Sequence, residues 1–274
     1  MTFWTLEHVL EHDGLDPDLL ARRFAAEPIF GIGHAVREFV TAIHAGAPWC
    51  AAAPRSAGNG ALMRIAPVLI PHFTTGGALW ADAALAAAVT HNDSASISAC
   101  VSFVSLLWQA MTLQRPPEPM WWIDEYVRVA SQLETEHRYR PRTQQLDFDG
   151  TLSHFVDTEV RMAVENQCTA RAACDRWYSG AYLLETVPSV LQILALHAHD
   201  PEEAIVRAVN DTKDNDTIGA IVGAAVGALH GRQGLPQRWL SQLSGRVGAA
   251  DDGHIFAMIK AMRDHLRGHV SGSG

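Results

Sequence analysis

Residues 209–231 read VNDTKDNDTIGAIVGAAVGALHG, and this stretch decides the fold class. Residues 217–229 within it contain no ionic side chain, and glycine recurs there at every fourth position, as Gly219, Gly223 and Gly227. A spacing of four places these glycines on one side of a helix. Each glycine costs about 1 kcal/mol in a helix interior relative to alanine. We therefore predict a buried helix whose glycine side packs closely against a neighbouring helix.

Helical spacing continues along most of the chain, and the alternating patterns typical of strands are scarce. Residues 94–111 carry apolar side chains at steps of four, three and four, and Asp93 before them suits a helix N-cap. Helical stretches also surround Leu10, Leu19, Leu20 and Phe24. Further helices are expected at residues 120–133, 156–177, 181–197, 201–209, 217–229, 236–243 and 253–266. The sequence therefore predicts an all-α fold, a single compact helical bundle.

Length and composition favour one domain. The chain has 274 residues, of which 48% are apolar and 19% charged. This length exceeds what one core comfortably supports, but the apolar pattern is continuous, so we expect one domain and not two. The polar, proline-bearing segment 114–150 is expected to form long connections around one helix. We place the domain at residues 1–268 and expect residues 269–274 to form a disordered tail.

Charge and cysteine content argue against several classes of protein. The 21 basic and 30 acidic residues leave a net charge of −9, which argues against non-specific nucleic-acid binding. The four cysteines fall at no metal-ligand spacing, so we expect buried reduced thiols and not a disulfide or zinc site. The longest run without ionic residues is too short to cross a membrane, which takes about 20 residues. We expect a soluble, cytoplasmic protein.

An acidic turn precedes the glycine-bearing helix. Asp211, Asp214 and Asp216 lie within six residues, and the last two converge only if Asp214 lies in the incoming turn while Asp216 begins the helix. Three neighbouring carboxylates repel one another unless a cation lies among them, and carboxylate with hydroxyl oxygens suits Mg2+, Mn2+ or Ca2+. The alternative is helix capping by Asp216 or Thr217, together with solvated loop charge. Spacing alone leaves both interpretations open.

Two further motifs are candidates for ligand binding. Gly58-Asn59-Gly60 supplies a flexible turn with open amides at the start of a helical segment, which suits phosphate or hydroxyl oxygens. A plain turn is the alternative. His91 comes directly before a predicted helix, where it either contacts a ligand or serves as a cap or a packed surface residue.

Taken in order, five segments resemble the ADP-ribosylglycohydrolase family over roughly residues 7–243. They are GNGALMRIAPV, TH before a helix, SGAYLLETVPSVLQIL, residues 209–231 and LPQRWLSQL. The D-x-D-T followed by a small-residue helix is the most specific of them. The resemblance implies an all-α bundle around a dinuclear Mg2+ or Mn2+ centre in a cleft. It also implies metal-dependent cleavage of the bond between ADP-ribose and an acceptor, through an oxocarbenium-like state.

The same resemblance implies roles for individual residues, and it assigns no catalytic residue. The implied metal ligands are Asp214, Asp216 and Thr217. The implied binding residues for the phosphates and ribose of the ligand are Ser56, Gly58, Asn59, Gly60 and His91. The expected partners are ADP-ribose and ADP-ribosylated proteins or small molecules.

One departure from the family pattern concerns the first residues. Family members begin with a helix that bears a G-D motif and an essential glutamate, followed by a T-D-D motif, whereas residues 1–4 here align with the helix after T-D-D. We therefore expect a domain without the family's first helix, with half of the metal ligands and weaker metal binding. We also expect an uncovered apolar groove near the glycines of 217–229, and a monomer or weak self-association.

Three functional hypotheses follow from these patterns. The leading one is an ADP-ribosylglycohydrolase-like hydrolase. The second is a pseudoenzyme that binds ADP-ribose or a related nucleotide without cleaving it. The third is a purely structural bundle in which the acidic turn only caps a helix.

Overall fold

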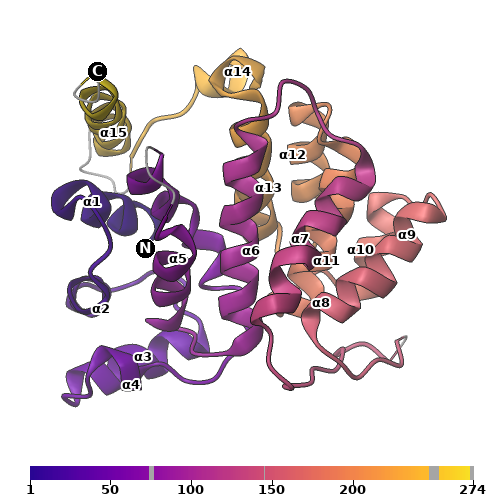
Figure 1. Cartoon of the computed structure of the whole chain (residues 1–274), viewed down its shortest axis with the longest axis horizontal. Coiled ribbons are helices and arrows are strands. Elements are labelled where there is room, and N and C mark those ends of the chain that lie inside the picture. Colours follow the sequence, from indigo (N-terminus) through magenta and orange to yellow (C-terminus); the bar gives the residue numbers. More distant parts are fainter. Residues whose placement is uncertain (74–76, 145, 247–252, 272–274) are drawn as a thin grey trace.

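The computed structural model describes residues 1–73, 77–144, 146–246 and 253–271. Over these ranges the regular secondary structure is helical, and the only β pairing consists of the isolated bridges Gly58–Tyr182 and Tyr139–Gly150. The predicted all-α fold is confirmed. Figure 1 shows the helices gathered around one upright central helix, α6.

The helix α6 (Ser94–Ala110) forms the centre because it can be buried on all sides. Its sequence mixes small residues with apolar ones, and nearly all its side chains lie inside the protein. The Asp93 carboxylate caps it by accepting a hydrogen bond from Ala95 N, as the sequence predicts. The small residues let α5 (Leu79–Ala88), α7 (Pro119–Leu133) and α13 (Asn215–His230) pack against α6. A second buried helix, α11 (Leu183–His197), contacts α7, α12 (Pro201–Asn210) and α13.

The remaining helices flank this centre on two sides (Figure 1). On one side lie α1 (Thr2–His12), α2 (Pro17–Ala26), α3 (His34–His44) and α4 (Trp49–Ala52), with α15 (His254–Ser271) packed on α1. On the other lie α8 (Leu152–Phe155), the π-helix η3 (Val156–Val160), α9 (Arg161–Glu165) and α10 (Ala170–Trp177). The short elements are the 3-10 helices η1 (Leu62–Arg64), η2 (Ala66–His72) and η4 (Arg232–Gly234), and α14 (Gln237–Leu240).

The glycines of α13 pack less closely than the sequence suggests. A Cβ atom at Gly219 would lie 3.3 Å from the Val209 side chain of α12, so close packing holds at this position. Cβ atoms at Gly223 and Gly227 would meet nothing within 4 Å. The prediction of a tightly packed glycine side is therefore wrong beyond the first turns. The helix buries its branched side instead, which includes Ile218 and Val222.

Two other sequence predictions need correction. The helix expected at residues 156–177 is broken: its first turn is π-helical, and residues 166–169 separate α9 from α10. Gln167 adopts a positive φ of 54° there, and Thr169 caps the new helix by accepting a bond from Ala172 N. The helix α15 continues through Ser271, so residues 269–271 of the expected disordered tail are helical, and 272–274 lie outside the described residues.

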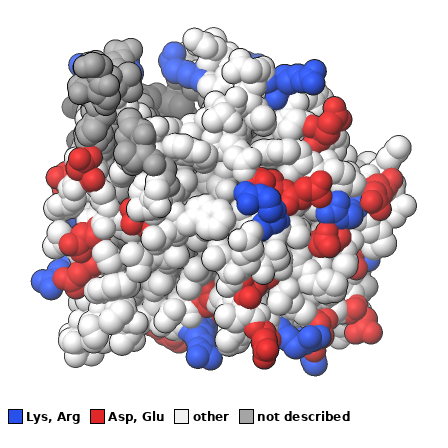
Figure 2. Space-filling model, viewed as in Figure 1, with Lys and Arg blue, Asp and Glu red and all other residues white. Residues whose placement is uncertain are grey.

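The cysteines, the surface charges and the helix lengths can be compared with what the composition predicts. All four cysteines are free thiols; Cys100 and Cys174 are buried as predicted, but Cys50 is exposed and Cys168 only half-buried. Figure 2 shows basic and acidic side chains interspersed on the visible face, with broad uncharged areas between them. In the part of the chain that the structure describes, no helix is long and apolar enough to span a membrane.

Candidate functional site

All the residues predicted to bind metal or substrate line one cavity of about 540 Å3. Segments far apart in the chain meet there: the loop 56–60, His91, Ala181 and the acidic turn at the start of α13. The lining also includes the first residues of α1, the loop 29–33 and the first turn of α3. The predicted residues that line it are Ser56, Gly58, Asn59, Gly60, His91, Asp214, Asp216 and Thr217. Their roles remain predictions, but the structure brings them together.

The glycine loop is held against the segment before α11. Asn59 N donates to Ala181 O at 3.0 Å, and Leu183 N donates to Ala57 O at 2.9 Å, which makes the short bridge between Gly58 and Tyr182. Ser56 Oγ accepts from Gly58 N at 3.2 Å and closes the turn. The backbone of the loop is therefore fixed from two sides and forms part of the cavity wall.

Gly60 is required because the His91 ring lies against it, whereas Gly58 is in ordinary contact with the same ring. A Cβ atom at Gly60 would come within 2.8 Å of His91 Cε1, and one at Gly58 within 3.5 Å of His91 Nε2. Real Cβ atoms do not approach a rigid ring as closely as the Gly60 position would require. The G-N-G motif is thus more than a plain turn, since its second glycine, Gly60, makes room for the histidine.

His91 is held as a neutral ring. Only 3% of the residue is exposed, and burial lowers the pKa of His91 to about 3, with the positive charge of Arg64 adding to the effect. Its Nδ1 lies 2.9 Å from Thr90 Oγ1. A ring that stays neutral in the ordinary pH range suits hydrogen bonding to a ligand better than proton transfer.

Asn59 links the glycine loop to the acidic turn. Its side-chain amide donates to Asp214 Oδ2 at 2.6 Å and to Thr186 Oγ1 at 2.9 Å. Thr186 in turn donates to Gly180 O at 2.7 Å. Asn59 is 6% exposed, so its amide acts inside the wall of the cavity. The sequence assigned Asn59 to ligand binding, and the structure adds this contact with a predicted metal ligand.

The acidic turn leads into α13 in the arrangement that allows Asp214 and Asp216 to converge. Asp214 occupies the N-cap position and Asp216 lies in the first turn. Asp214 makes no side-chain cap bond, whereas Asp216 Oδ1 accepts from Thr217 N at 2.9 Å. Capping by Asp216 is therefore present, but it uses one oxygen of one carboxylate. The two interpretations of the turn are compatible with each other.

The donor set of the turn fits a hard divalent cation. Burial raises the pKa of Asp214, and the neighbouring Asp216 adds to this, while the Asn59 amide partly opposes it. A carboxylate whose pKa is raised by a neighbouring carboxylate gains from a nearby positive charge. Thr217 adds a hydroxyl oxygen on the same cavity wall. Among the described residues no group of three or more His, Cys, Asp or Glu forms a metal cluster, so the set is limited to two carboxylates and a hydroxyl.

Asp211, the third carboxylate of the acidic stretch, serves a different purpose. It is buried at 7% exposure and lies 3.3 Å from both Arg171 and Arg207. These arginines neutralise its charge, so the expected repulsion among three carboxylates involves only Asp214 and Asp216. Asp211 does not line the cavity.

The backbone before α11 is unusual where it meets the acidic turn. Tyr178 and Ser179 have positive φ angles of 76° and 46°, a conformation that residues with side chains rarely adopt. Asp214 N donates to Ser179 O at 3.0 Å, and Lys213 N donates to Ser179 Oγ at 3.2 Å. Contacts with the acidic turn thus hold this strained segment in place.

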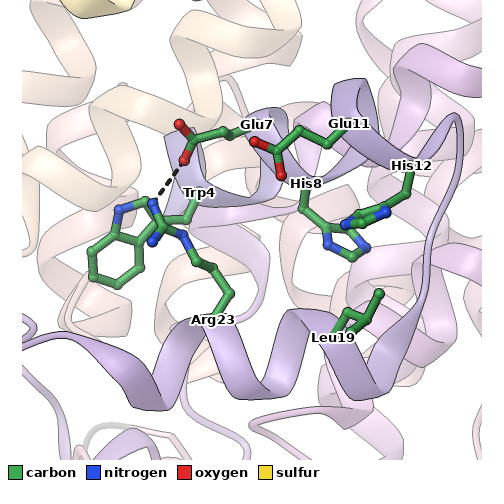
Figure 3. Close-up of a pocket in the computed structure, with 7 residues that line it drawn as sticks. All are labelled: Trp4, Glu7, His8, Glu11, His12, Leu19 and Arg23. Carbon is green, nitrogen blue, oxygen red and sulfur yellow. Dashed lines mark hydrogen bonds and ion pairs between the residues drawn. The ribbon is translucent and has the colours of Figure 1, made fainter.

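A smaller pocket of about 190 Å3 lies between α1 and α2, and Figure 3 shows its residues. Glu7 pairs with Arg23 at 2.8 Å beside the Trp4 ring, and the His8 and His12 rings lie 4.7 Å apart. His8 Nε2 accepts a hydrogen bond from Asp16 N at 3.0 Å. Glu7, Arg23 and His8 are thus engaged with their neighbours, and the larger cavity, which gathers the predicted residues, is the candidate site.

Sequence reasoning missed the apolar wall of the cavity. Phe30 is fully exposed on the loop beside Gly31, and Ile29 and Ile32 line the same wall. This segment has no helical periodicity. Because it is a loop, its sequence does not indicate which of its side chains face a site formed by residues much later in the chain. The link from Asn59 to Asp214 was missed for the same reason.

Comparisons with known proteins agree on one family. The ADP-ribosylglycohydrolase family model matches residues 1–268. Protein YegU of Escherichia coli is 26% identical over 84% of this chain and 70% of its own length. An ADP-ribosylarginine hydrolase of Pseudomonas putida is 22% identical over 70% of this chain and 43% of its own. A solved structure, titled an ADP-ribosylglycohydrolase-related protein complex, superposes with a TM-score of 0.68 at 25% identity, over 95% of this chain and 78% of that one.

Proposed function

Since the chain belongs to the ADP-ribosylglycohydrolase family and is a hydrolase of that type, we propose that it cleaves the glycosidic bond between ADP-ribose and an acceptor in a metal-dependent reaction. The observation that carries this proposal is the common cavity. Its lining combines two carboxylates and a hydroxyl at the start of α13 with the glycine loop and the His91 ring. Such a lining suits a ligand that has both ribose hydroxyls and phosphates.

The start of one helix supports the binding of the diphosphate. The helix α3 begins at the cavity, and in the described structure no side chain caps it. Free backbone N–H groups and the positive end of the helix dipole favour an anion there.

The acidic turn supports the metal-dependent part of the proposal. Asp214, Asp216 and Thr217 would hold Mg2+ or Mn2+, which supplies Lewis-acid polarisation of ribose and water oxygens when bound. Asn59 orients the Asp214 carboxylate through its short hydrogen bond. His91, neutral and packed between glycines, presents a fixed polar edge to the ligand.

The acceptor is the least determined part of the substrate. The Pseudomonas putida relative is named for ADP-ribosylarginine, and a Rhodospirillum rubrum relative, 33% identical over 25% of this chain and 23% of its own length, is named for ADP-ribosylated dinitrogen reductase. ADP-ribosylarginine is therefore the first substrate to test. The apolar wall at Ile29 and Phe30 also leaves room for an acceptor with apolar surface.

The test is release of ADP-ribose from ADP-ribosylated arginine and serine peptides by the purified chain with Mg2+ or Mn2+, alongside calorimetry with ADP-ribose. We expect binding and metal-dependent release, both weakened in Asp216→Asn. Asp18→Asn, which changes an exposed carboxylate on α2, is the matched control. Binding without release would support the nucleotide-binding alternative. Absence of both would overturn the proposal.

A further inference from the structure

A buried arginine lies behind the ligand-facing histidine. Arg64, at the end of η1, is 0% exposed, and its guanidinium lies 4.8 Å from the centre of the Phe24 ring. Burial lowers the pKa of Arg64 to about 10, so it remains charged near neutral pH. Its Nη2 donates to Ala86 O at 2.9 Å and to Thr90 Oγ1 at 2.6 Å. Its Nε and Nη1 have no hydrogen-bond partner among the described residues.

The contact with Arg64 determines what the Thr90 hydroxyl can do. A guanidinium only donates, so Thr90 Oγ1 must accept from Arg64. The hydroxyl keeps one proton of its own, and its other polar neighbour is His91 Nδ1 at 2.9 Å. If Nδ1 carried a proton, Thr90 would accept two bonds and its own proton would have no acceptor within the described hydrogen bonds. The fully satisfied arrangement has Thr90 donating to an unprotonated Nδ1.

The other ring nitrogen of His91 then carries the proton. Since the ring is neutral and Nδ1 accepts, Nε2 is an N–H donor. Nε2 lies on the side of the glycine loop, where a Cβ at Gly60 would be 3.1 Å from it, and His91 lines the cavity. In the described structure Nε2 makes no hydrogen bond, so its donor is available to a ligand.

We propose that Arg64 and Thr90 are positioning residues that fix His91 as an Nε2–H donor aimed into the cavity. The relay runs from the guanidinium to the Thr90 hydroxyl, to Nδ1, and through the ring to the Nε2–H group. Each bond polarises the next, so the buried charge strengthens a neutral donor at the cavity surface. The ligand atom it serves is an anionic or hydroxyl oxygen, which on the proposed function is a phosphate or ribose oxygen of ADP-ribose.

The relay also explains why an unpaired cation is tolerated inside the protein. A buried charge without an ionic partner is costly, and Arg64 bonds to a carbonyl and a hydroxyl and lies over an aromatic ring, with no ion pair among the described residues. A leucine or methionine could fill the same space at lower cost. The arginine supplies what an apolar residue cannot, namely a donor to Thr90 Oγ1, which leaves the Thr90 proton to be donated to His91 Nδ1.

The test uses the ligand-free protein with 15N-labelled histidine. Two-bond 1H–15N spectra distinguish a protonated from an unprotonated ring nitrogen, and we expect His91 to show Nδ1 unprotonated and Nε2 protonated at pH 7. Thr90→Val keeps the shape but removes the hydroxyl, so the Nδ1 resonance should move to the position of a nitrogen without a hydrogen bond. Thr90→Ser should restore the wild-type position. Ser189→Ala, which removes another buried hydroxyl, should leave His91 unchanged.

A protonated Nδ1 in the wild-type protein, or identical His91 resonances in wild type and Thr90→Val, would overturn the inference. In calorimetry with ADP-ribose, we expect Thr90→Val to weaken binding about tenfold and Thr90→Ser to bind nearly as wild type does. Equal affinity of Thr90→Val and wild type for ADP-ribose would show that the relay does not contribute to ligand binding. If the wild type itself fails to bind ADP-ribose, the proposed function is overturned, whereas the spectra still decide the protonation of His91.

Discussion

The side-chain amide of Asn59 lies 2.6 Å from a carboxylate oxygen of Asp214, although 155 positions separate the two residues. This hydrogen bond joins the glycine loop to the acidic turn, the two parts of the cavity that the sequence assigned to different roles. Because the same amide also reaches Thr186 in α11, three segments are tied together at one point. A change at Asn59 should therefore affect stability as well as binding.

Asn59→Ala should lower the free energy of unfolding by about 1–3 kcal/mol, because it leaves the half-buried Asp214 carboxylate and the Thr186 hydroxyl without their donor. Urea unfolding at pH 7 measures this. Asn210→Ala removes an exposed amide that bonds only to Val206 O, and it should change stability by less than about 0.5 kcal/mol. Equal effects of the two substitutions would show that the link to Asp214 is not structural.

Gly60→Ala and Gly223→Ala should have opposite effects. The new Cβ at position 60 would lie 2.8 Å from the His91 ring, so the ring or the loop must shift, and both stability and ADP-ribose affinity should fall. At position 223 the Cβ meets nothing within 4 Å and the helix gains up to about 1 kcal/mol. Thermal unfolding of the two variants provides the comparison. Destabilisation by Gly223→Ala would mean that this side of α13 is covered in solution.

Asp211→Asn and Asp216→Asn should separate structural from metal-binding carboxylates. The first removes the charge that pairs with Arg171 and Arg207, so we expect a stability loss of about 1–3 kcal/mol and unchanged Mn2+ affinity. The second should weaken Mn2+ binding by at least about tenfold with little effect on stability. Calorimetric titration with Mn2+ and urea unfolding give the two readouts. The reverse pattern would refute the assignment of Asp216 as a ligand.

Stability should fall in mild acid because of His91. Its pKa of about 3 in the folded protein lies below the ordinary 6.5 of the unfolded chain. As pH falls, the unfolded chain takes up this proton first, so the stabilisation is complete above pH 6.5 and is lost between 6.5 and 3, at up to about 1.4 kcal/mol per pH unit.

The measurement for this prediction is urea unfolding at pH 7 and pH 5, for the wild type and for His91→Gln. All other ionisable groups are common to the two proteins, so their contribution cancels in the difference. We expect the wild type to lose roughly 2 kcal/mol more than the variant over this range. An equal loss in both proteins would show that His91 is not the buried neutral group described above.

Local patterns predicted the central helices well. The limits of α6 and its Asp93 cap follow from apolar spacing and one side chain, and α7, α11, α12 and α13 lie within a few residues of their predicted positions. The break before Ala170 was missed because apolar residues continue through it at helical spacing. The π-helical turn at Val156–Val160 adds one residue per turn, which no short-range pattern reveals.

The residues that line the candidate site could be predicted from the sequence, but the side-chain contacts between its segments could not. The family resemblance named the residues that line the cavity, but nothing in the motif GNGALMRIAPV indicates that its asparagine reaches Asp214, or that its arginine reaches Thr90. Asp211 was grouped with Asp214 and Asp216 because the three are close in sequence, whereas helix geometry turns it toward Arg171 and Arg207. Such contacts depend on how helices pack, which spacing along one segment does not encode.

The bridge between Gly58 and Tyr182 has a consequence for the order of folding. Closing a loop of more than a hundred residues is entropically costly, and we expect it to be favourable only once α6 and α7, which lie between its ends, have packed with α11. We therefore expect the cavity to be assembled late, after the core that supports it, and to be among the first parts to open. Amide hydrogens of Asn59 and Leu183 should accordingly exchange with solvent faster than those in the middle of α6, although all of them are hydrogen-bonded in the native protein.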